Sequence, residues 1–577
     1  MKEDDGSESI KSLFVPLTNK KAILWIIAIG FIVYGNMLFN GFVWDDESQI
    51  LSNHTVQSVY NIPKLFTGST FESKNSTSKL SGIYYRPLMS TSFSIIYSFF
   101  GANSFFFHLF QLTVHVVNTI LVFVFFKKFL NKELAFLSAI LFLVHPIDVE
   151  AVSFISALND PLYFLFGISA LVLSTTPRVT VRRSIVISIL LLCSLLSKET
   201  GILFFIMVLI YHVIFKKVKN NTVKMILTTS IPLLIYFLIR FYIVHFFIRT
   251  QPDAIMSKAP IAQRIITMPA ILFFYLKTFL LPKDLLINQE WVITHLTLQF
   301  FEALLIDTFF IAVVVTFGYS LYKRKNILFP SFIFFCTWFL SGILLHIQIF
   351  PLEMTVADRW FYFPIIGIIG MIAIGIQFLS KPVSKLRNLG LISIIIVLIV
   401  FSLRTISRNI NWENNTSLYT HDLKYNKNDA IELNLATSLM DAKKYEDAQK
   451  YYEDLIKRQP ENTALYINLG YLYQAKGNKQ GAEVIYRKIL DKDKTGLAYY
   501  NLAGILVDKN AGEAQALLNE GLKKFPGYGR LWEMAAYVDY QLGDQKNALN
   551  KARKANELIK NSETEMLLDS IQNKRQI

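Results

Sequence analysis

Long apolar runs separated by short polar segments fill the chain up to about residue 405, and a mostly polar region follows. A helix needs about 20 apolar residues to cross the hydrocarbon core of a bilayer. Runs of roughly this kind predict membrane-spanning helices at 22–40, 104–126, 134–145, 160–174, 184–197, 201–215, 225–247, 302–322, 328–346, 363–380 and 388–404. The apolar run at 88–100 is too short to span comfortably, so it predicts a helix at the membrane interface.

The polar region repeats with a period of about 34 residues. Alanines recur at spacings of 34, 32 and 34, at Ala448, Ala482, Ala514 and Ala548. Small residues lie twelve positions before three of them, at Ala436, Gly470 and Ala536. This period, with small residues where paired helices pack closely, is typical of tetratricopeptide repeats. Such repeats stack into a solenoid whose concave surface binds a peptide.

These two patterns predict an all-α protein in which a polytopic transmembrane helix bundle is followed by a tetratricopeptide-repeat α-solenoid. The predicted parts are a cytosolic N-terminal tail (1–21), a transmembrane domain (22–405) and the repeat domain (413–577). The first apolar run has no small-residue cleavage site, so it is expected to be a retained span rather than a removed signal peptide.

Charge placement predicts the orientation of the spans. The formal net charge is +15, and Lys and Arg gather at the ends of apolar runs, as they do in loops that stay in the cytosol. With Lys20-Lys21 inside, loop 41–87 and the repeats both fall on the external face, provided that 262–281 does not cross. No basic stripe is interleaved with stacking aromatics, so nucleic acid is not an expected partner. Both cysteines, Cys193 and Cys336, lie in apolar runs and form no metal or redox motif.

Ionisable residues gather at the predicted external ends of the spans. Asp45-Asp46 follow the first span directly, and further candidates recur along the chain: Arg86, His145, Asp148, Glu150, Lys198, Glu199, Asp358 and Arg359. Each alone is also explained as an interfacial charge or a structural ion pair. Together they suit one cleft, because cations bind a phosphate and a carboxylate deprotonates a hydroxyl. A lipid tail would enter through the bilayer, so the set predicts transfer from a lipid-linked phosphate to an external acceptor.

Several motifs, in this order, carry a family resemblance: GFVWDD (41–46), YYRPL (84–88), FHLFQLTVHVVN (107–118), LFLVHPIDVEAV (141–152), LLSKETGI (195–202), RFYIVHF (240–246) and VADRWFYFP (356–364). With the repeats, they resemble the transmembrane and tetratricopeptide-repeat O-mannosyltransferases and their prokaryotic relatives. The resemblance implies the GT-C fold of glycosyltransferases that use polyprenyl-phosphate sugars. Gln111 stands where the family pattern leads us to expect Asn.

The resemblance implies roles for these residues. The acidic pair of the first external loop, regarded as catalytic in the family, matches Asp45 and Asp46. We expect Arg86, Lys198 and Arg359 to bind the donor phosphate, with inversion of a mannose-like hexose during transfer to a protein hydroxyl. The expected partners are a polyprenyl-phosphate sugar, membrane lipid and an acceptor protein or peptide bound by the repeats. No cofactor is identified, and a divalent metal is possible.

A second hypothesis is a non-catalytic membrane assembly factor or transporter whose repeats recruit a partner. A transporter favours inverted repeats with a site at the membrane midplane. The spans show no internal symmetry and the acid pair lies at the interface, so both observations favour the enzyme. The chain has no endoplasmic-reticulum retention tail, which favours a prokaryotic plasma membrane with external repeats over an endoplasmic-reticulum membrane with lumenal ones.

Overall fold

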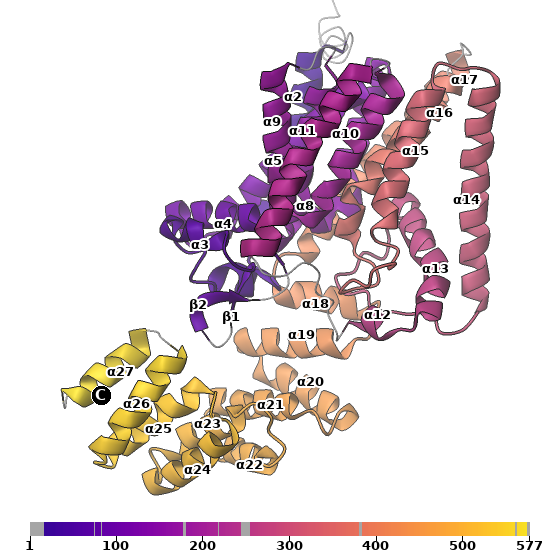
Figure 1. Cartoon of the computed structure of the whole chain (residues 1–577). Helices are drawn as coiled ribbons and strands as arrows, with labels where there is room; N and C mark the ends of the chain where they lie inside the picture. Colours follow the sequence, from indigo (N-terminus) through magenta and orange to yellow (C-terminus); the bar gives the residue numbers. More distant parts are fainter. Residues whose placement is uncertain are drawn as a thin grey trace, which may run out of the picture. The chain divides into compact units, whose positions relative to one another are not determined.

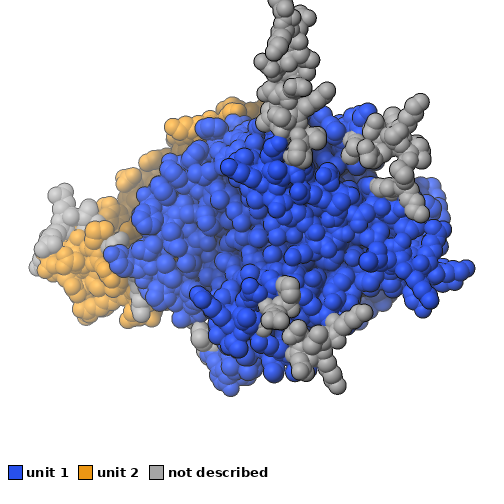
Figure 2. Space-filling view, turned by 90° about the horizontal axis from the view of Figure 1, so that it is seen from above, with its two compact units in different colours: residues 1–51, 56–67, 83–414 blue, residues 52–55, 68–82, 415–577 orange. Residues whose placement is uncertain are grey.

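The computed structural model describes residues 17–73, 76–81, 84–176, 180–216, 219–243, 254–379, 384–559 and 562–573. Most of the predicted N-terminal tail therefore lies outside the described residues. The chain divides into two compact units (Figure 2). We call residues 1–51, 56–67 and 83–414 the membrane unit, and residues 52–55, 68–82 and 415–577 the repeat unit.

The membrane unit is a bundle of long apolar helices (Figure 1). They are α2 (Asn19–Tyr34), α5 (Ser104–Phe126), α6 (Lys132–Val144), α8 (Asn159–Ser174), α9 (Val181–Ser197), α10 (Ile202–Phe215), α11 (Lys219–Leu238), α13 (Ile261–Leu280), α14 (Leu298–Lys323), α15 (Phe329–Leu344), α16 (Pro364–Leu379) and α17 (Ser384–Asn411). Each predicted span coincides with one of these helices over most of its described residues, and the end of the span predicted at 225–247 lies outside the described residues. The predicted helical bundle is confirmed.

Within the described residues, six helices are long and apolar enough to cross a membrane, or seven if the bent pair Lys132–Val144 and Pro146–Ser153 forms one span. These helices make the chain an integral membrane protein. Helix α13, which covers the run predicted not to cross, is not among them. Its path relative to the membrane stays a prediction.

Two devices hold neighbouring helices close together. A Cβ on Gly367 of α16 would lie 2.4 Å from the backbone nitrogen of Phe339 on α15, so only glycine permits this approach. In α11, Pro232 has no N–H to donate to the carbonyl of Thr228 one turn earlier. Ser188 of α9 donates to that carbonyl instead, at 2.7 Å, so its hydrogen bond is restored where lipid offers none.

Short elements connect α2 to α5 and carry part of the candidate site. They are the helical turns η1 (Gly35–Phe39), η2 (Glu47–Leu51) and η3 (Val59–Asn61), the helices α3 (Ile62–Leu65) and α4 (Pro87–Phe100), and the strands β1 (Phe71–Ser73) and β2 (Ser76–Ser81). The two strands pair antiparallel, with Phe71 opposite Ser81. Figure 1 shows α4 running across the direction of the upright helices. Its location at the membrane interface stays a prediction.

Further helical turns lie between the spans: η4 (Pro146–Asp148), α7 (Val149–Ser153), η5 (Ile155–Ala157), η6 (Glu199–Gly201), η7 (Ile239–Ile243), α12 (Ile255–Lys258) and η8 (Asp358–Tyr362). They mark the places where spans break or end. Half of the predicted site residues lie on them: Asp148, Glu150, Glu199, Asp358 and Arg359.

The repeat unit consists of paired antiparallel helices. Its helices are α18 (Asn415–Leu423), α19 (Asp429–Asp441), α20 (Tyr445–Arg458), α21 (Thr463–Ala475), α22 (Lys479–Ile489), α23 (Leu497–Leu506), α24 (Ala511–Lys524), α25 (Gly529–Gln541), α26 (Gln545–Ile559) and α27 (Ser562–Gln572). The four periodic alanines are fully buried. A Cβ on Gly470 would lie 2.5 Å from the ring of Tyr486, which explains why a small residue recurs there. The predicted solenoid is confirmed.

The first repeat has a lysine at the turn between its helices, where the second and fourth repeats have glycine. Gly477 and Gly543 adopt φ of +79° and +81° in the second and fourth repeats, and Lys443 adopts +59° at the corresponding position of the first. A lysine in this left-handed region costs about 1 kcal/mol relative to glycine, because its Cβ approaches the backbone carbonyl.

We therefore expect Lys443→Gly to stabilise the first repeat by roughly 0.5–1 kcal/mol. Hydrogen exchange of amides in α19 and α20, measured in the full chain, will show slower opening. The reverse change Gly477→Lys serves as the matched control and should speed exchange in α21 and α22. Unchanged or faster exchange in K443G would contradict this account of the turn.

Candidate functional site

The acidic pair follows a strained turn at the end of the first span. Trp44 has φ +53°, an unusual conformation for a bulky residue. Its ring stacks on Phe154, with ring centroids 5.3 Å apart and planes inclined by 15°. The turn sends the side chains of the next two residues, Asp45 and Asp46, into different surroundings.

Asp46 is fully buried and its carboxylate is held by three hydrogen bonds. The Val43 N–H donates to one oxygen at 2.9 Å, while the N–H and hydroxyl of Ser156 donate to the other at 2.8 and 2.5 Å. Burial raises the pKa of Asp46 to about 7, although these hydrogen bonds favour the charged form. Asp46 thus links the start of the first loop to the turn η5.

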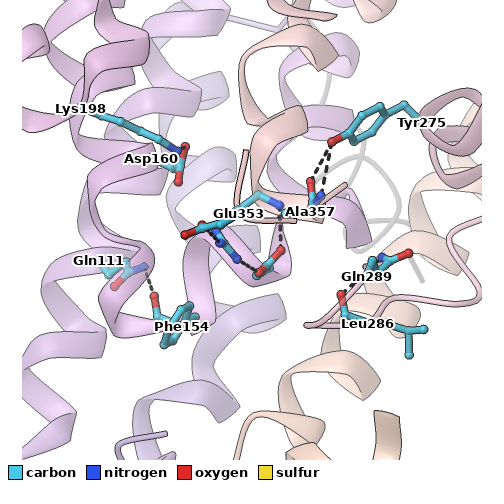
Figure 3. A network of polar contacts seen from close by, with 11 residues as sticks. Gln111, Phe154, Asp160, Lys198, Tyr275, Leu286, Gln289, Glu353 and Ala357 are labelled. Carbon is cyan, nitrogen blue, oxygen red and sulfur yellow. Dashed lines mark hydrogen bonds and ion pairs between the residues drawn. The ribbon is translucent and has the colours of Figure 1, made fainter. Parts of the chain in front are cut away.

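The turn η5, which carries the Ser156 that hydrogen-bonds to Asp46, is itself held in place. Gln111 of α5 donates to the carbonyls of Ala151 and Phe154, at 2.7 and 2.8 Å, and holds the break between α7 and η5 in place (Figure 3). The longer side chain found where Asn was expected therefore has a role in shaping the chain that contacts Asp46.

Asp45 is partly exposed, and among the described residues no group hydrogen-bonds its carboxylate. Burial raises its pKa, and Arg359 and Arg86 act in the opposite direction. Glu353 is close enough to raise it further. Asp45 is therefore a carboxylate with unused hydrogen-bonding capacity beside two guanidinium groups, whereas the capacity of Asp46 is largely used.

Arg359 lies at the centre of this cluster. Its guanidinium pairs with Glu150 and with Glu353, the latter at 3.1 Å, and its backbone N–H donates to Glu150 at 2.9 Å. Tyr84 donates its hydroxyl to Glu353. Burial acts to raise the pKa of Glu353, but Arg359, Tyr84 and Arg86 outweigh it and lower that pKa. Only 11% of the Arg359 side chain is exposed, so the pairing is largely shielded from water.

Two further cations are also neutralised. Lys198 pairs with Asp160 at 2.6 Å, with both side chains buried (Figure 3). Glu199 pairs with Arg240 at 3.0 Å. Lys198 interacts electrostatically with Arg359 and lies in the same cluster, so the structure brings these predicted residues together.

Arg86 differs from the other cations. Among the described residues it forms no ion pair, and its buried Nε has no hydrogen-bond partner. Its guanidinium lies 4.4 Å from the ring centroid of Tyr84. The side-chain amide of Asn159, oriented to satisfy both neighbours, accepts from Arg86 and donates to the Ala157 carbonyl, each at 3.1 Å. Arg86 is near enough to Glu199 and Glu353 to lower their pKa, but its hydrogen bonds leave donors of the guanidinium available for an anion.

Three predicted site residues have other surroundings. His145 interacts with the Phe279 carbonyl at 3.0 Å, and its imidazole stacks on the Phe279 ring, so it contacts α13. Asp148 is buried beside Tyr34 and Tyr362. Asp358 is buried at the start of η8. In the described ranges, no three His, Cys, Asp or Glu side chains are grouped as ligands for a metal.

The cluster contains residues that were not predicted as site candidates: Ser156, Asn159, Asp160, Arg240 and Glu353. Asp160 directly precedes a proline at the start of an apolar run, a position that could have drawn attention to it. Glu353 is the only acid between 308 and 357, but nothing in the sequence connects it to Arg359.

Fold and site together define a class: an integral membrane protein with a carboxylate-and-arginine cluster and a tetratricopeptide-repeat unit. A family model described as tetratricopeptide repeat matches residues 433–496. Mouse and human proteins named protein O-mannosyl-transferase TMTC3 are both 27% identical to the chain over 81% of its length. The nematode Caenorhabditis elegans has a protein O-mannosyl-transferase, F38B6.6, that is 26% identical over 80% of the chain.

These relatives confirm the resemblance to the transmembrane and tetratricopeptide-repeat O-mannosyltransferases. The chain spans about half the length of the two TMTC3 proteins, 54% of each, and 64% of the nematode protein.

The raised pKa of Asp46 predicts how stability depends on pH. Its pKa is about 7 in the folded protein and ordinarily 3.8, so folding favours the protonated form. Stability from this group is fully present below pH 3.8, falls by at most about 1.4 kcal/mol per pH unit as pH rises from there to about 7, and levels off above that.

Thermal unfolding of the purified protein between pH 5 and 8 tests this expectation. Asp46→Asn should remove the decline with pH, and should lower stability at all pH values because an amide cannot accept all three hydrogen bonds. Glu302→Gln, at an exposed position of α14 outside the cluster, is the control and should leave the decline with pH unchanged. A decline that persists in D46N would mean that another group causes it.

Proposed function

We propose that this protein is a membrane glycosyltransferase that transfers a mannose-like hexose from a polyprenyl-phosphate carrier to a hydroxyl of a protein on the external face. The observation that carries this proposal is the unequal surroundings of the acidic pair. Asp45 is an unbonded carboxylate beside Arg86 and the Arg359 cluster, whereas Asp46 is locked to Ser156. The names of the relatives support the same reaction class.

In the proposed reaction Asp45 is the general base. The acceptor hydroxyl gives its proton to Asp45 as its oxygen forms a bond to C1 of the hexose. The bond between C1 and the phosphate oxygen breaks, and the polyprenyl phosphate leaves with the electron pair. A single displacement of this kind inverts the configuration at C1. Burial raises the pKa of Asp45, which makes its carboxylate a stronger base than that of an ordinary aspartate.

Arg86 is the proposed ligand of the donor phosphate. The leaving phosphate gains negative charge as the bond to C1 breaks, and a guanidinium stabilises it through forked hydrogen bonds. Arg86 is suited to this role because its guanidinium forms no ion pair among the described residues. Lys198 and Arg359 are already paired with carboxylates, so they add to the local positive potential and hold the cluster together.

Asp46 is the proposed positioning residue. Its three hydrogen bonds fix the turn that presents Asp45. Placement of the site on the external face follows from the basic loops on the opposite ends of the spans, and it belongs to the proposal. The role of the repeats in choosing the acceptor is likewise part of the proposal.

The base assignment predicts unequal effects of two isosteric substitutions. Asp45→Asn should slow transfer by roughly 10²–10⁴-fold, the range for loss of a general base, with stability unchanged. Asp46→Asn should lower stability, with a smaller loss of rate in the fraction that stays folded. The measurement is the initial rate of transfer from radiolabelled polyprenyl-phosphate mannose to protein, with folding checked by gel filtration. Near-normal transfer by well-folded D45N would rule out Asp45 as the base.

The phosphate assignment predicts an effect on donor binding. Arg86→Gln should raise the KM for the donor roughly 10- to 100-fold, because charge-assisted hydrogen bonds contribute about 1.5–3 kcal/mol. Arg86→Lys should recover part of the loss, since it keeps the charge but not the fork. The exposed Arg324, outside the cluster, provides the control Arg324→Gln. A donor KM that is unchanged in R86Q would exclude Arg86 as the phosphate ligand.

A further inference from the structure

A groove of about 360 Å³ lies between α9 and α11, two neighbouring helices of the membrane unit (Figure 1). Its lining residues recur every three or four positions, from Val181 to Leu192 on α9 and from Lys224 to Ile235 on α11. Several apolar side chains of the lining are exposed, among them Ile185. The groove therefore opens at the surface of the bundle.

The groove begins at the ends of the two helices that lie farther from the candidate site. Helix α9 starts at Val181 and ends beside Lys198, and α11 starts near Lys224 and leads into Arg240; Lys198 and Arg240 belong to the charged cluster. The first and last lining positions are eleven residues apart on each helix, or about 16 Å at a rise of about 1.5 Å per residue. The hydrocarbon core of a bilayer is about 30 Å thick, so the groove matches the depth of one leaflet.

Polar groups at the start of the groove point to a ligand. The hydroxyls of Ser188 and Thr228 are used within the protein, because they donate to the carbonyls of Thr228 and Lys224. Ser184, in the first turn of α9, is only 8% exposed, and among the described residues its hydroxyl has no hydrogen-bond partner. A buried hydroxyl without a partner is costly, so a ligand in the groove is expected to supply one.

The same end of the groove is positively charged. Lys224 lines it, and the exposed residues Arg182 and Arg183 directly follow Val181. Neither α9 nor α11 contains an Asp or Glu. Cations at one end and an apolar path beyond them match a lipid with a phosphate headgroup and a hydrocarbon chain.

We propose that this groove binds one acyl chain of an anionic phospholipid, with the lipid phosphate beside Lys224 and an oxygen of the glycerol ester accepting from Ser184. The inference does not depend on the proposed transfer reaction. A polyprenyl carrier matches the groove less well, because its chain is longer than one leaflet is deep. Its proposed phosphate ligand, Arg86, also lies near Glu199, at the other end of α9. With the proposed topology, the basic end faces the cytosolic leaflet, which is rich in anionic lipids.

A bound lipid would hold together two helices that position part of the charged cluster. Glu199 follows α9 and pairs at 3.0 Å with Arg240, which follows α11. An acyl chain in the groove contacts both helices along their first halves. We therefore expect the phospholipid to stabilise the folded protein as well as to bind it.

The first test counts lipids on the purified full chain. Native mass spectrometry in an uncharged detergent, with dioleoyl phosphatidylglycerol or dioleoyl phosphatidylcholine added, gives the apparent Kd of each. Phosphatidylglycerol should bind roughly fivefold more tightly or better, the effect of one lysine beside an anionic lipid. Lys224→Gln should remove this preference. Lys323→Gln, an exposed lysine at the end of α14, is the matched control and should keep it.

A second test blocks the groove and leaves its charge intact. Ile231→Trp places a larger side chain at an exposed lining position, and should weaken binding of phosphatidylglycerol roughly tenfold, the effect of losing about two buried CH₂ groups. Leu234→Trp is the matched control, because Leu234 is exposed on the same helix but lies outside the groove. Phosphatidylglycerol should raise the Tm of the wild type and L234W, but not that of I231W.

The buried hydroxyl gives a third readout. Without lipid, Ser184→Ala should unfold at a higher temperature than the wild type, because it removes a buried group that lacks a partner. Phosphatidylglycerol should then raise its Tm by less than it raises that of the wild type. An undiminished rise in S184A would overturn the contact assigned to this hydroxyl.

Three results would overturn the proposal as a whole. The first is equal affinity for phosphatidylglycerol and phosphatidylcholine, and the second is unaltered phosphatidylglycerol binding by I231W. The third is displacement of phosphatidylglycerol by a lower concentration of undecaprenyl phosphate, because the carrier lipid would then be the occupant of the groove.

Discussion

The candidate site depends on the neutralisation of one buried guanidinium. Arg359 is paired with Glu150 of α7 and with Glu353 of the segment before η8, and Tyr84 joins the same carboxylate. A charge removed from water is costly unless it is paired and hydrogen-bonded, so these three segments must lie together. Loss of either acid would leave an uncompensated charge, which is far more destabilising than loss of a surface pair. The cluster therefore fixes the segments next to which the side chains of Asp45 and Arg86 lie.

This constraint also separates the charges that hold the structure together from those that we propose to act on the substrates. The cations of the cluster with carboxylate partners, Lys198, Arg240 and Arg359, hold breaks between helices together. Arg86 is held by an aromatic ring and an amide. The acids divide in the same way, since Asp46 is saturated with hydrogen bonds and Asp45 is not. A site of this kind needs paired charges for its shape and a few unpaired ones for its chemistry.

Periodicity made most of the fold predictable from the sequence. Apolar runs of membrane length fell on helices, and the alanines spaced by about 34 residues are buried between paired helices because only a small side chain fits there. The candidate site was predictable only in part. The motifs pointed to Asp45, Asp46, Arg86 and Arg359, but adjacent acids look equivalent in a sequence. Their difference arises from Ser156, more than 100 residues away, and long-range pairs such as Glu150 with Arg359 leave no local pattern.

The most direct test of the account is a structure of the protein with a non-hydrolysable polyprenyl-phosphonate mannose analogue bound. The account predicts that the phosphonate oxygens lie within hydrogen-bond distance of Arg86. It also predicts that Asp45 faces C1 of the mannose from the side opposite the phosphonate, where an acceptor hydroxyl would attack. A phosphonate bound away from Arg86, or an Asp45 carboxylate on the same side of C1 as the phosphonate, would contradict the account.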